Sequence, residues 1–544
     1  MKMKTEASKR EGLFGPSRAS GLSDRFRLRL MVDGLLRPIF GGSRTSVCLA
    51  LIASVALSLP ASGAEAAPVV RDRAPTTYCN PISLPDYPIG RLVRDLPENA
   101  PPGEQYRELA DPSALWYEGK WYLYPSCDMA WVSSDEGLTW VHHPLNVRDI
   151  GYAPTVVKHD GRFLLVASDA ELYSSSSPLG PFEKVGKMQL PKVPGMPWFW
   201  DPMLFSDHGR LFLYWGCTPR DGIWAVELDA KNPLVTISKP FCAIPFRPDL
   251  QPWEALGDWN QDATVGWLEG AWMLKVKNRY YLTYSAAGTE YRTYAMGCYV
   301  SDSPLGPFKP QKRNPILRTT EGLITGTGHG CIVAGPRGRL WAFYCVHASV
   351  LNGFERRIGF DLAAIDANGE LYVPQATSLP QYLPAPVGAP DRPLSPGWLP
   401  LNQGEPAAVS SAAGNLTGRF AVDNNLMTWW QPAKGDANPV LTTAFRAPTT
   451  VRAVRLIWRD IGLDTRRGAN PGPFRYRVEV ETAPKTWQVV LDRSKSQEDL
   501  LIDYRECAPV KGSSARLVIV GAPKGITPGV AEFTVFGDKC IGTQ

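Results

Sequence analysis

A short pattern of hydrophobic and polar positions recurs five times along the middle of the chain. Each copy opens on a polar or small residue, continues as a short apolar strand, turns at glycine or asparagine and returns as an aromatic-rich strand. This pattern is typical of β-hairpins. The distance from the opening residue to the turn is eight residues in three copies and nine in two. The copies open at Asp111, Ala153, Asp201, Glu269 and His329.

Repeats of this kind predict the blades of a β-propeller. One small sheet cannot bury both of its faces until neighbouring sheets pack against it in a ring. The turn motif Ser-x-Ser-Pro-Leu-Gly-Pro-Phe also repeats, at 175–182 and 301–308. We therefore expect a five-bladed propeller over residues 109–378. Helical periodicity is scarce, so the whole protein should be all-β.

The composition of the chain changes after the last repeat. Eight prolines fall between residues 380 and 406, which indicates a semi-rigid linker over 379–405. From 406 to 544, strand-like runs alternate with Pro/Gly turns over a length typical of a β-sandwich. Residues 67–108 form a lead-in to the first blade. The predicted fold is thus a five-bladed β-propeller followed by a β-sandwich.

Charge and hydropathy predict a removable leader over residues 1–66. This stretch holds ten Lys/Arg and five Asp/Glu, which accounts for the whole formal charge of +5 on the 544-residue chain. An apolar segment at 47–59 and the small residues at 64–66 follow the pattern of a secretory signal peptide, with Met31 as an alternative start. The apolar segment is shorter than the ~20 residues that span a bilayer. We expect an exported protein, periplasmic or extracellular, with no membrane contact once the leader is removed.

The charge of the chain without the leader argues against nucleic acid as a partner. Without the leader, 58 less 10 basic residues and 53 less 5 acidic residues leave 48 of each. A formally neutral chain gives no electrostatic basis for nucleic-acid binding. Nine cysteines remain, an odd number, so at least one thiol should stay free. No spacing of Cys or His matches a structural zinc site. The sequence does not indicate an oligomeric state.

The opening residues of the repeats are the candidate catalytic residues. In a propeller, the innermost strand of each blade begins near the central axis, so these residues should converge on one pocket. They include three carboxylates and a histidine, where packing alone would favour small or apolar residues. Glycoside hydrolysis requires two carboxyl groups, one protonated and one ionised, with environments that separate their pKa values.

The motifs around these residues resemble glycoside hydrolase family 43. They are Ala110-Asp111-Pro112, Asp201-Pro202-Met203-Leu204-Phe205, Glu269-Gly270-Ala271 and Gly328-His329-Gly330, in that order. The resemblance implies Asp111 as general base, Glu269 as general acid and Asp201 as the group that raises the pKa of the acid and orients it. It further implies an inverting hydrolase of poly- or oligosaccharides, of the α-L-arabinofuranosidase, β-xylosidase or galactanase type.

The resemblance also suggests further site residues. His329 lies where family members hold a hydrated Ca²⁺ on the propeller axis, with a hydrogen-bonded core histidine as the other interpretation. Arg356 matches a substrate-contacting arginine, and Arg357 competes with it by register. No cofactor is required beyond such an ion. Several tryptophans flank the acids and form either a sugar-stacking wall or blade core: Trp198, Trp200, Trp267 and Trp272.

The C-terminal region resembles a discoidin or coagulation-factor type C sandwich, a jelly roll. The resemblance rests on Asp423-Asn424-Asn425, on Thr428-Trp429-Trp430 and on the closing strand from Glu532. Asp423 lies where that fold often holds a structural Ca²⁺. A carbohydrate-binding role and a purely structural role both stay open for this region.

Two alternative functions also stay open. The first is a retaining, fructosidase-like enzyme with a five-bladed propeller, although its Asn-Asp-Pro-Asn and Arg-Asp-Pro motifs are missing and no Glu-Cys falls within residues 109–378. The second is a non-catalytic glycan-binding propeller. Three converging carboxylates argue against the second alternative, because their mutual repulsion would destabilise a site that serves only for binding.

Overall fold

The computed structural model describes residues 73–94, 103–390 and 392–539, which belong to one compact unit. The predicted leader over residues 1–66 lies outside the described residues. Within the described part of the chain, α1 (Arg91–Arg94) is the one α-helix, and no helix is long and apolar enough to cross a membrane. Eight cysteines are described and all eight are free thiols.

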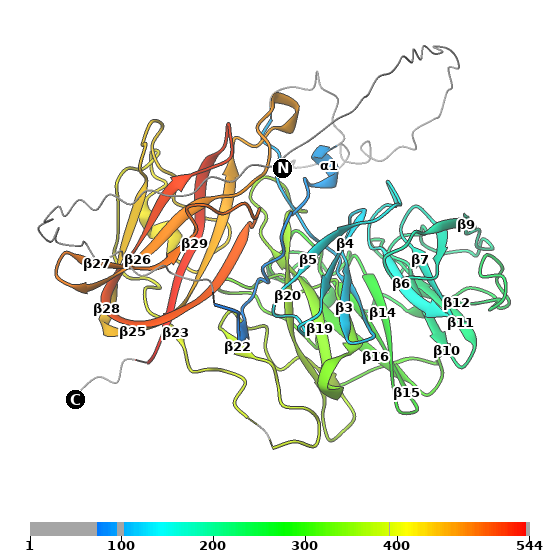
Figure 1. Cartoon of the computed structure of the whole chain (residues 1–544). Helices are drawn as coiled ribbons and strands as arrows, with labels where there is room; N and C mark the ends of the chain where they lie inside the picture. Colours follow the sequence, from blue (N-terminus) through cyan, green and yellow to red (C-terminus); the bar gives the residue numbers. More distant parts are fainter. Residues whose placement is uncertain (1–72, 95–102, 391, 540–544) are drawn as a thin grey trace, which may run out of the picture. The chain divides into compact units, whose positions relative to one another are not determined.

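Five four-stranded antiparallel sheets follow one another along the chain, each with its strands in sequence order (Figure 1). The predicted five-bladed propeller is thereby confirmed. The blades are β2 (Ser113–Tyr117), β3 (Lys120–Tyr124), β4 (Met129–Ser133) and β5 (Val141–Pro144); β6 (Thr155–His159), β7 (Arg162–Val166), β8 (Glu171–Ser175) and β9 (Glu183–Lys187); β10 (Met203–Asp207), β11 (Arg210–Trp215), β12 (Ile223–Leu228) and β13 (Phe241–Ile244); β14 (Glu269–Val276), β15 (Arg279–Ala286), β16 (Ala295–Ser301) and β17 (Lys309–Pro310); β18 (Cys331–Ala334), β19 (Leu340–His347), β20 (Arg356–Ile365) and β21 (Leu371–Tyr372).

The first strands of the blades form a closed ring. Strands β2, β6, β10, β14 and β18 each pack against the first strand of the next blade, and β18 packs against β2. The second strands β3, β7 and β11 are exposed only at their first residue and buried from there on. They are rich in aromatic and aliphatic residues because neighbouring blades cover both faces of each sheet.

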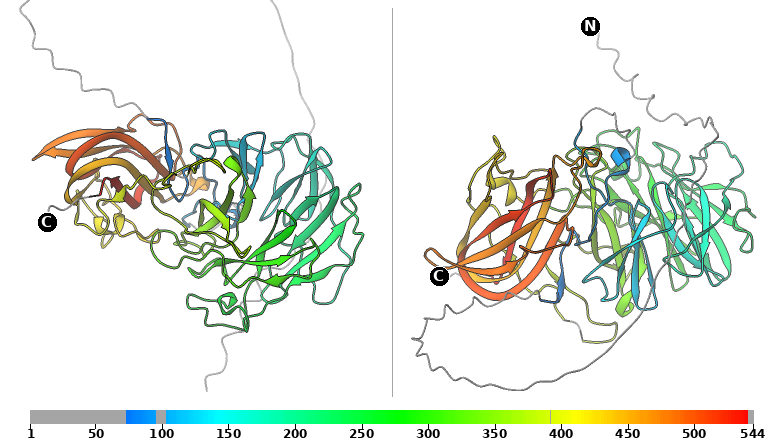
Figure 2. Two further views of the ribbon diagram at one scale, coloured as in Figure 1. Left: turned by 90° about the horizontal axis from the view of Figure 1, so that it is seen from below. Right: turned by 45° about the horizontal axis from the view of Figure 1, so that its top comes forward.

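The C-terminal region is a seven-stranded β-sheet assembly, consistent with the predicted sandwich. Strands β25 and β28 are long and pair with register shifts, and Figure 2 shows this sheet strongly curved. Such irregularities let a strand bend from one layer of a sandwich into the other. Its strands are β23 (Leu399–Pro400), β24 (Ala407–Val409), β25 (Val440–Ile461), β26 (Arg475–Ala483), β27 (Thr486–Asp492), β28 (Ile502–Gly521) and β29 (Thr527–Gly537).

Short elements complete the fold. Strands β1 (Thr77–Tyr78) and β22 (Gln381–Tyr382) pair with each other, and the 3₁₀ turns are η1 (Pro252–Glu254), η2 (Pro336–Gly338), η3 (Gly418–Ala421) and η4 (Thr465–Arg467). One continuous cluster of buried apolar side chains includes Trp121 in β3, Phe343 in β19 and Trp458 in β25. The C-terminal region therefore shares a hydrophobic core with the first and fifth blades.

Candidate active site

In each blade, a residue at the start of the first strand has a left-handed backbone conformation. This residue stands two positions before the regular pairing of the strand begins, and its φ lies between 34° and 61°. Such a backbone costs about 1–3 kcal/mol for a residue other than glycine. One pocket is lined by all five of these residues, as the convergence of strand starts predicts. They are Asp111, Ala153, Asp201, Gly270 and His329.

The fourth blade departs from the register that the hairpin spacing suggests. The spacing aligns Glu269 with the other two acids, but Gly270 holds the left-handed position in the structure, with φ of 61°. The pairing register shifts directly after Glu269, which explains why this repeat is one residue longer. A Cβ at Gly270 would lie 2.8 Å from the ring of His329. Both the backbone and the close approach of the ring therefore require glycine here.

Asp111 is almost fully buried and is held by three side chains. Its Oδ1 accepts a hydrogen bond from Arg356 Nη1 at 2.6 Å, and its Oδ2 accepts one from Ser126 Oγ at 2.6 Å. His329 Nδ1 lies 3.1 Å from the same Oδ1. Burial works to raise the pKa of Asp111, but Arg356, His329 and the Ser126 hydroxyl together hold that pKa below its ordinary value. Asp111 is therefore ionised at neutral pH.

Asp201 is also buried, but its surroundings raise its pKa rather than lower it. Burial raises the pKa of Asp201 to about 7; His329 opposes that rise, and the charges of Glu269 and Asp111 add to it. His329 Nδ1 lies 3.8 Å from Asp201 Oδ2, so this imidazole faces both aspartates. Two neighbouring carboxyl groups thus carry pKa values moved apart by their surroundings, the arrangement that acid–base chemistry requires.

Glu269 accepts a hydrogen bond at each carboxylate oxygen. Tyr294 Oη donates to Oε1, and Cys217 Sγ donates to Oε2 at 3.0 Å. One ligand atom each from Asp201, Cys217 and Glu269 all lie within 4.8 Å of one another. Glu269 is therefore fixed in orientation beside Asp201. A Cβ at Gly328 would lie 2.4 Å from the Tyr294 ring, so the Gly-His-Gly motif also leaves room for this tyrosine.

The structure distinguishes the two candidate arginines. Arg356 and Arg357 are consecutive in β20, and consecutive residues of a strand point to opposite faces. Arg356 donates to Asp111. Arg357 donates instead to Glu355 Oε1 at 2.9 Å and to the carbonyl oxygen of Arg107 at 2.8 Å. Only Arg356 contacts a member of the acid group.

The predicted tryptophans occupy different surroundings. Trp272 donates its indole N–H to the carbonyl oxygen of Ile332 at 3.0 Å and packs against the buried clusters of the blades. Trp200 and Trp267 are half-buried next to Asp201 and Glu269 in the chain. Trp198 is 63% exposed and its ring centroid lies 4.9 Å from that of Trp200.

A hydroxyl or thiol between the blades is a site feature that the sequence analysis missed. At the end of the second strand, four blades carry a Ser or Cys that accepts the backbone N–H of the next opening residue. The pairs are Ser126 with Ala153 (2.8 Å), Ser168 with Asp201 (3.1 Å), Ser285 with His329 (2.7 Å) and Cys345 with Asp111 (3.2 Å). In the sequence, each of these Ser or Cys residues stands at the end of its hairpin repeat, so the repeat pattern could have identified them. Tyr294 and Cys217 carry no such signal.

Further polar groups gather near Arg356. Glu108 Oε2, Tyr106 Oη and Tyr152 Oη are buried without a hydrogen-bond partner among the described residues. Burial raises the pKa of Glu108 to about 7, against the opposing charge of Arg356, and Asp111 adds to the rise. Buried polar atoms normally have partners, so these three are exceptions among the described residues. Tyr152 stands where family members often have tryptophan, and sequence reasoning did not select Glu108.

Part of the propeller is similar in sequence to known proteins. Residues 129–370 match the model of the glycosyl hydrolases family 43. A β-D-galactofuranosidase, xynD, of Aspergillus niger is 27% identical over 264 residues, which are 41% of this chain and 69% of the relative. An arabinoxylan arabinofuranohydrolase of Paenibacillus polymyxa is 25% identical over 273 residues, 40% of this chain but only 42% of that relative.

A solved structure is also similar to part of this chain. A crystal structure of a thermostable family-43 glycoside hydrolase is 24% identical, with a TM-score of 0.43, and the match covers 57% of this chain and 100% of that chain. The family model itself covers four of the five opening residues, Ala153, Asp201, Glu269 and His329. The propeller of this chain is thus similar to family 43 glycoside hydrolases, and the protein is a glycosidase.

Proposed function

We propose that this glycosidase hydrolyses glycosidic bonds of poly- or oligosaccharides by an inverting mechanism, with arabinofuranosidase or β-xylosidase type activity. We also propose that the leader over residues 1–66 directs its export. The contact of Arg356 with Asp111 carries the mechanism, because it keeps one buried carboxylate ionised beside a second pair of carboxyl groups. The names of the two curated relatives favour a furanoside as the substrate.

Asp111 acts as the general base. An inverting enzyme needs an ionised carboxylate that accepts a proton from the attacking water. Arg356, His329 and Ser126 supply the charge and hydrogen bonds that stabilise this form. A base whose pKa lies low stays ionised over the whole neutral range, so base ionisation limits activity only on the acid side of the pH profile.

Glu269 acts as the general acid. Burial raises the pKa of the neighbouring Asp201 to about 7, with His329 opposing the rise and Glu269 adding to it, so Asp201 keeps its proton until the pH approaches that value. Glu269 donates a proton to the leaving glycosidic oxygen, while Tyr294 and Cys217 keep its carboxyl group in place. Asp201 serves as the neighbouring carboxyl group that orients the acid.

The test of the proposed function is a substrate screen with product stereochemistry. Aryl α-L-arabinofuranosides, β-D-galactofuranosides and β-D-xylosides are incubated with the enzyme, and ¹H NMR identifies the first anomer released. We expect turnover of at least one furanoside and release of the opposite anomer. Release of the same anomer would indicate a retaining enzyme. Polysaccharide binding without any turnover would favour the glycan-binding alternative.

We propose that any ion on the propeller axis is hydrated rather than caged by protein. Ca²⁺ takes about 6–8 oxygen ligands. The carboxylate oxygens of Asp111 already accept bonds from Arg356 and Ser126, so the described axial residues fit an ion that His329 and Asp201 hold through water. Bound there, its positive charge would favour the ionised carboxylates.

We propose a second Ca²⁺ site in the C-terminal region, at Asp423. The buried Glu532 lies close to it, and the Asn424 N–H donates to Glu532 Oε2 at 3.0 Å. Burial raises the pKa of Glu532 to about 8, with Arg455 opposing the rise and Asp423 adding to it. Two like-charged carboxylates beside each other fit a cation, which would compensate their repulsion.

Calcium is expected to raise the thermal unfolding temperature of the wild-type protein. At a hundredfold excess over Kd, the binding free energy adds about 2.7 kcal/mol to stability. The effect should be larger above about pH 8 than below it, because Glu532 must lose its proton to bind the ion. Differential scanning calorimetry with Ca²⁺ and with a chelator measures the shift.

Asp423→Asn should reduce this calcium-dependent shift to the part that an axial ion contributes. Asp436→Asn is the matched control, since Asp436 lies in the same region and already accepts bonds from Ser410 and Ser411. An undiminished shift in Asp423→Asn would contradict the site.

A further inference from the structure

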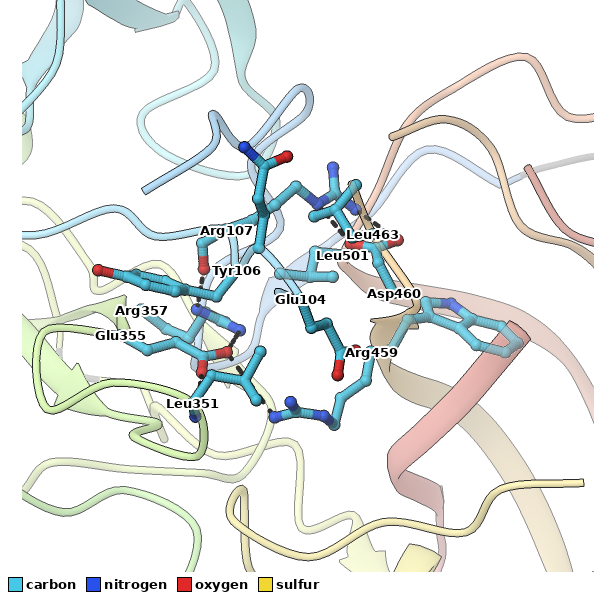
Figure 3. Close-up of a pocket in the computed structure, with 12 residues that line it drawn as sticks. Glu104, Tyr106, Arg107, Leu351, Glu355, Arg357, Arg459, Asp460, Leu463 and Leu501 are labelled. Atoms are coloured by element: carbon cyan, nitrogen blue, oxygen red, sulfur yellow. Dashed lines mark hydrogen bonds and ion pairs between the residues drawn. The ribbon is translucent and has the colours of Figure 1, made fainter. Parts of the chain in front are cut away.

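A pocket beside the active site is lined by the C-terminal region as well as by the propeller. Figure 3 shows it between the lead-in segment, the start of β20 and the end of β25. Arg356, which holds Asp111, is the residue between Glu355 and Arg357, and both of these neighbours line the pocket. The pocket-lining residues of the C-terminal region are Trp458, Arg459, Asp460, Leu463 and Leu501.

Two chains of contacts connect these neighbours to the C-terminal region. In the first, Glu355 Oε1 lies 2.9 Å from Arg357 Nη2 and 3.8 Å from Arg459 Nη1 (Figure 3). In the second, Arg357 donates to the carbonyl oxygen of Arg107, whose guanidinium bonds Asp460 at 2.6 Å. Arg107 also bonds Asp499 at 2.6 Å. Both sides of Arg356 are thus fixed by charges from β25 and its neighbourhood.

The charged side chains in these contacts are buried, so each of them needs a partner of opposite charge. The side chains of Arg107, Glu355, Arg357, Arg459 and Asp460 are all at most 8% exposed. A buried charge must be paired, and loss of one partner leaves the other uncompensated in a medium of low dielectric. Without Arg459, Glu355 would keep its closer partner Arg357 but lose a second positive charge, so we expect its carboxylate to move or to recruit water.

Glu355 also organises the loop that carries Arg356. Its Oε2 accepts the backbone N–H groups of Val350 and Leu351 at 3.4 and 3.5 Å. Arg356 Nε donates to the carbonyl oxygen of Phe354 at 3.2 Å. The carboxylate of Glu355 therefore connects Arg459, the loop over 350–354 and the guanidinium that contacts Asp111.

We propose that Arg459 is a positioning residue for the reaction, which through Glu355 holds Arg356 against Asp111. The C-terminal region is then part of the catalytic unit rather than a detachable module. This inference rests on the proposed role of Asp111 as general base. It assigns the C-terminal region a function that does not depend on whether the region binds glycan.

The pH profile distinguishes positioning from a merely structural role. Arg356 lowers the pKa of Asp111, so displacement of Arg356 raises that pKa and the base becomes protonated at higher pH. The acid limb of kcat/KM should therefore move to higher pH. The other titratable or charged groups that act on Asp111 stay unchanged in the variants: Glu108, Tyr152, Asp201, Cys217, Tyr294, His329 and Cys345.

The experiment compares Arg459→Met with Arg459→Lys in the full-length enzyme. For Arg459→Met we expect the acid limb to rise by about half a pH unit or more and kcat/KM at the optimum to fall by about tenfold to a hundredfold. Arg459→Lys should restore most of both values, because it keeps the charge. Glu355→Gln should reproduce the Arg459→Met profile, and it provides the readout if Arg459→Met does not fold.

Arg516→Met is the matched control. Arg516 also pairs with a glutamate, Glu479, and lies 4.3 Å over a tryptophan ring, as Arg459 lies 4.5 Å over Trp429. Its pH profile should equal that of the wild type. An unchanged acid limb in folded Arg459→Met and Glu355→Gln, with Asp111→Asn inactive, would overturn the positioning role alone. Full activity of Asp111→Asn would overturn the base assignment and this inference with it.

Discussion

Asp111→Asn is expected to lower kcat by about 10²–10⁴-fold, the usual contribution of a general base. The amide cannot accept a proton from water, yet it has nearly the same size and keeps an oxygen for Arg356. The fold should therefore persist, and circular dichroism with thermal unfolding checks that it does. Steady-state kinetics on the best aryl glycoside from the substrate screen measures the loss.

Asp207→Asn is the control for the Asp111 variant. Asp207 is also an aspartate with a lowered pKa and a cationic partner, Lys275, at 2.8 Å, but it lies at the far end of β10 from the axis. We expect its kcat to stay within a few-fold of the wild type. Equal losses in the two variants would show that a salt-bridged aspartate matters only for structure here.

Glu269→Gln is expected to have an effect that depends on the leaving group. Glycosides with poor leaving groups need the proton of the acid, so kcat should fall by about 10²–10⁴-fold for alkyl glycosides and natural oligosaccharides. Dinitrophenyl glycosides depart without protonation, so their kcat should fall far less. A plot of log kcat against the pKa of the leaving group should thus be steeper for the variant than for the wild type.

The control for Glu269 is another buried glutamate with a tyrosine partner. Glu254 accepts a hydrogen bond from Tyr284 Oη at 2.5 Å and is fully buried. Glu254→Gln should show the same dependence on leaving group as the wild type, whatever its stability. Equal losses for good and poor leaving groups in Glu269→Gln would rule out Glu269 as the acid.

These variants also separate the competing functions. A retaining enzyme of the fructosidase type would use one of its carboxylates as a nucleophile, and its first product would keep the anomeric configuration. A glycan-binding propeller would show no turnover in any variant. Only an inverting hydrolase combines inverted product, an inactive base variant and a leaving-group effect confined to the acid variant.

The blade count and the acid group could be predicted from the sequence because they are periodic. A hairpin repeat fixes where each first strand begins, and propeller geometry brings the strand starts to one axis. Asp111, Asp201 and His329 line one pocket in the structure. The fourth blade departs from this rule by one residue, since the hairpin spacing aligned Glu269 where the structure has Gly270.

The supporting contacts could not be predicted, because they join residues that are distant in the chain. Arg356 and Asp111 are 245 positions apart, and Tyr294 reaches Glu269 from a loop between strands. The choice between Arg356 and Arg357 depends on which face of β20 turns inward, and the register of that strand decides it. No local pattern records the partner across a ring of five sheets.

Local spacing of apolar, polar and turn residues is enough to predict the all-β architecture, the five blades and the acids near their strand starts. The neighbours that contact those acids depend on the packing of the whole chain: Arg356 at Asp111, Tyr294 and Cys217 at Glu269, and Arg459 behind Glu355. Charges and hydrogen bonds act on a carboxyl group only within a few ångströms, and such proximity arises when distant segments pack together.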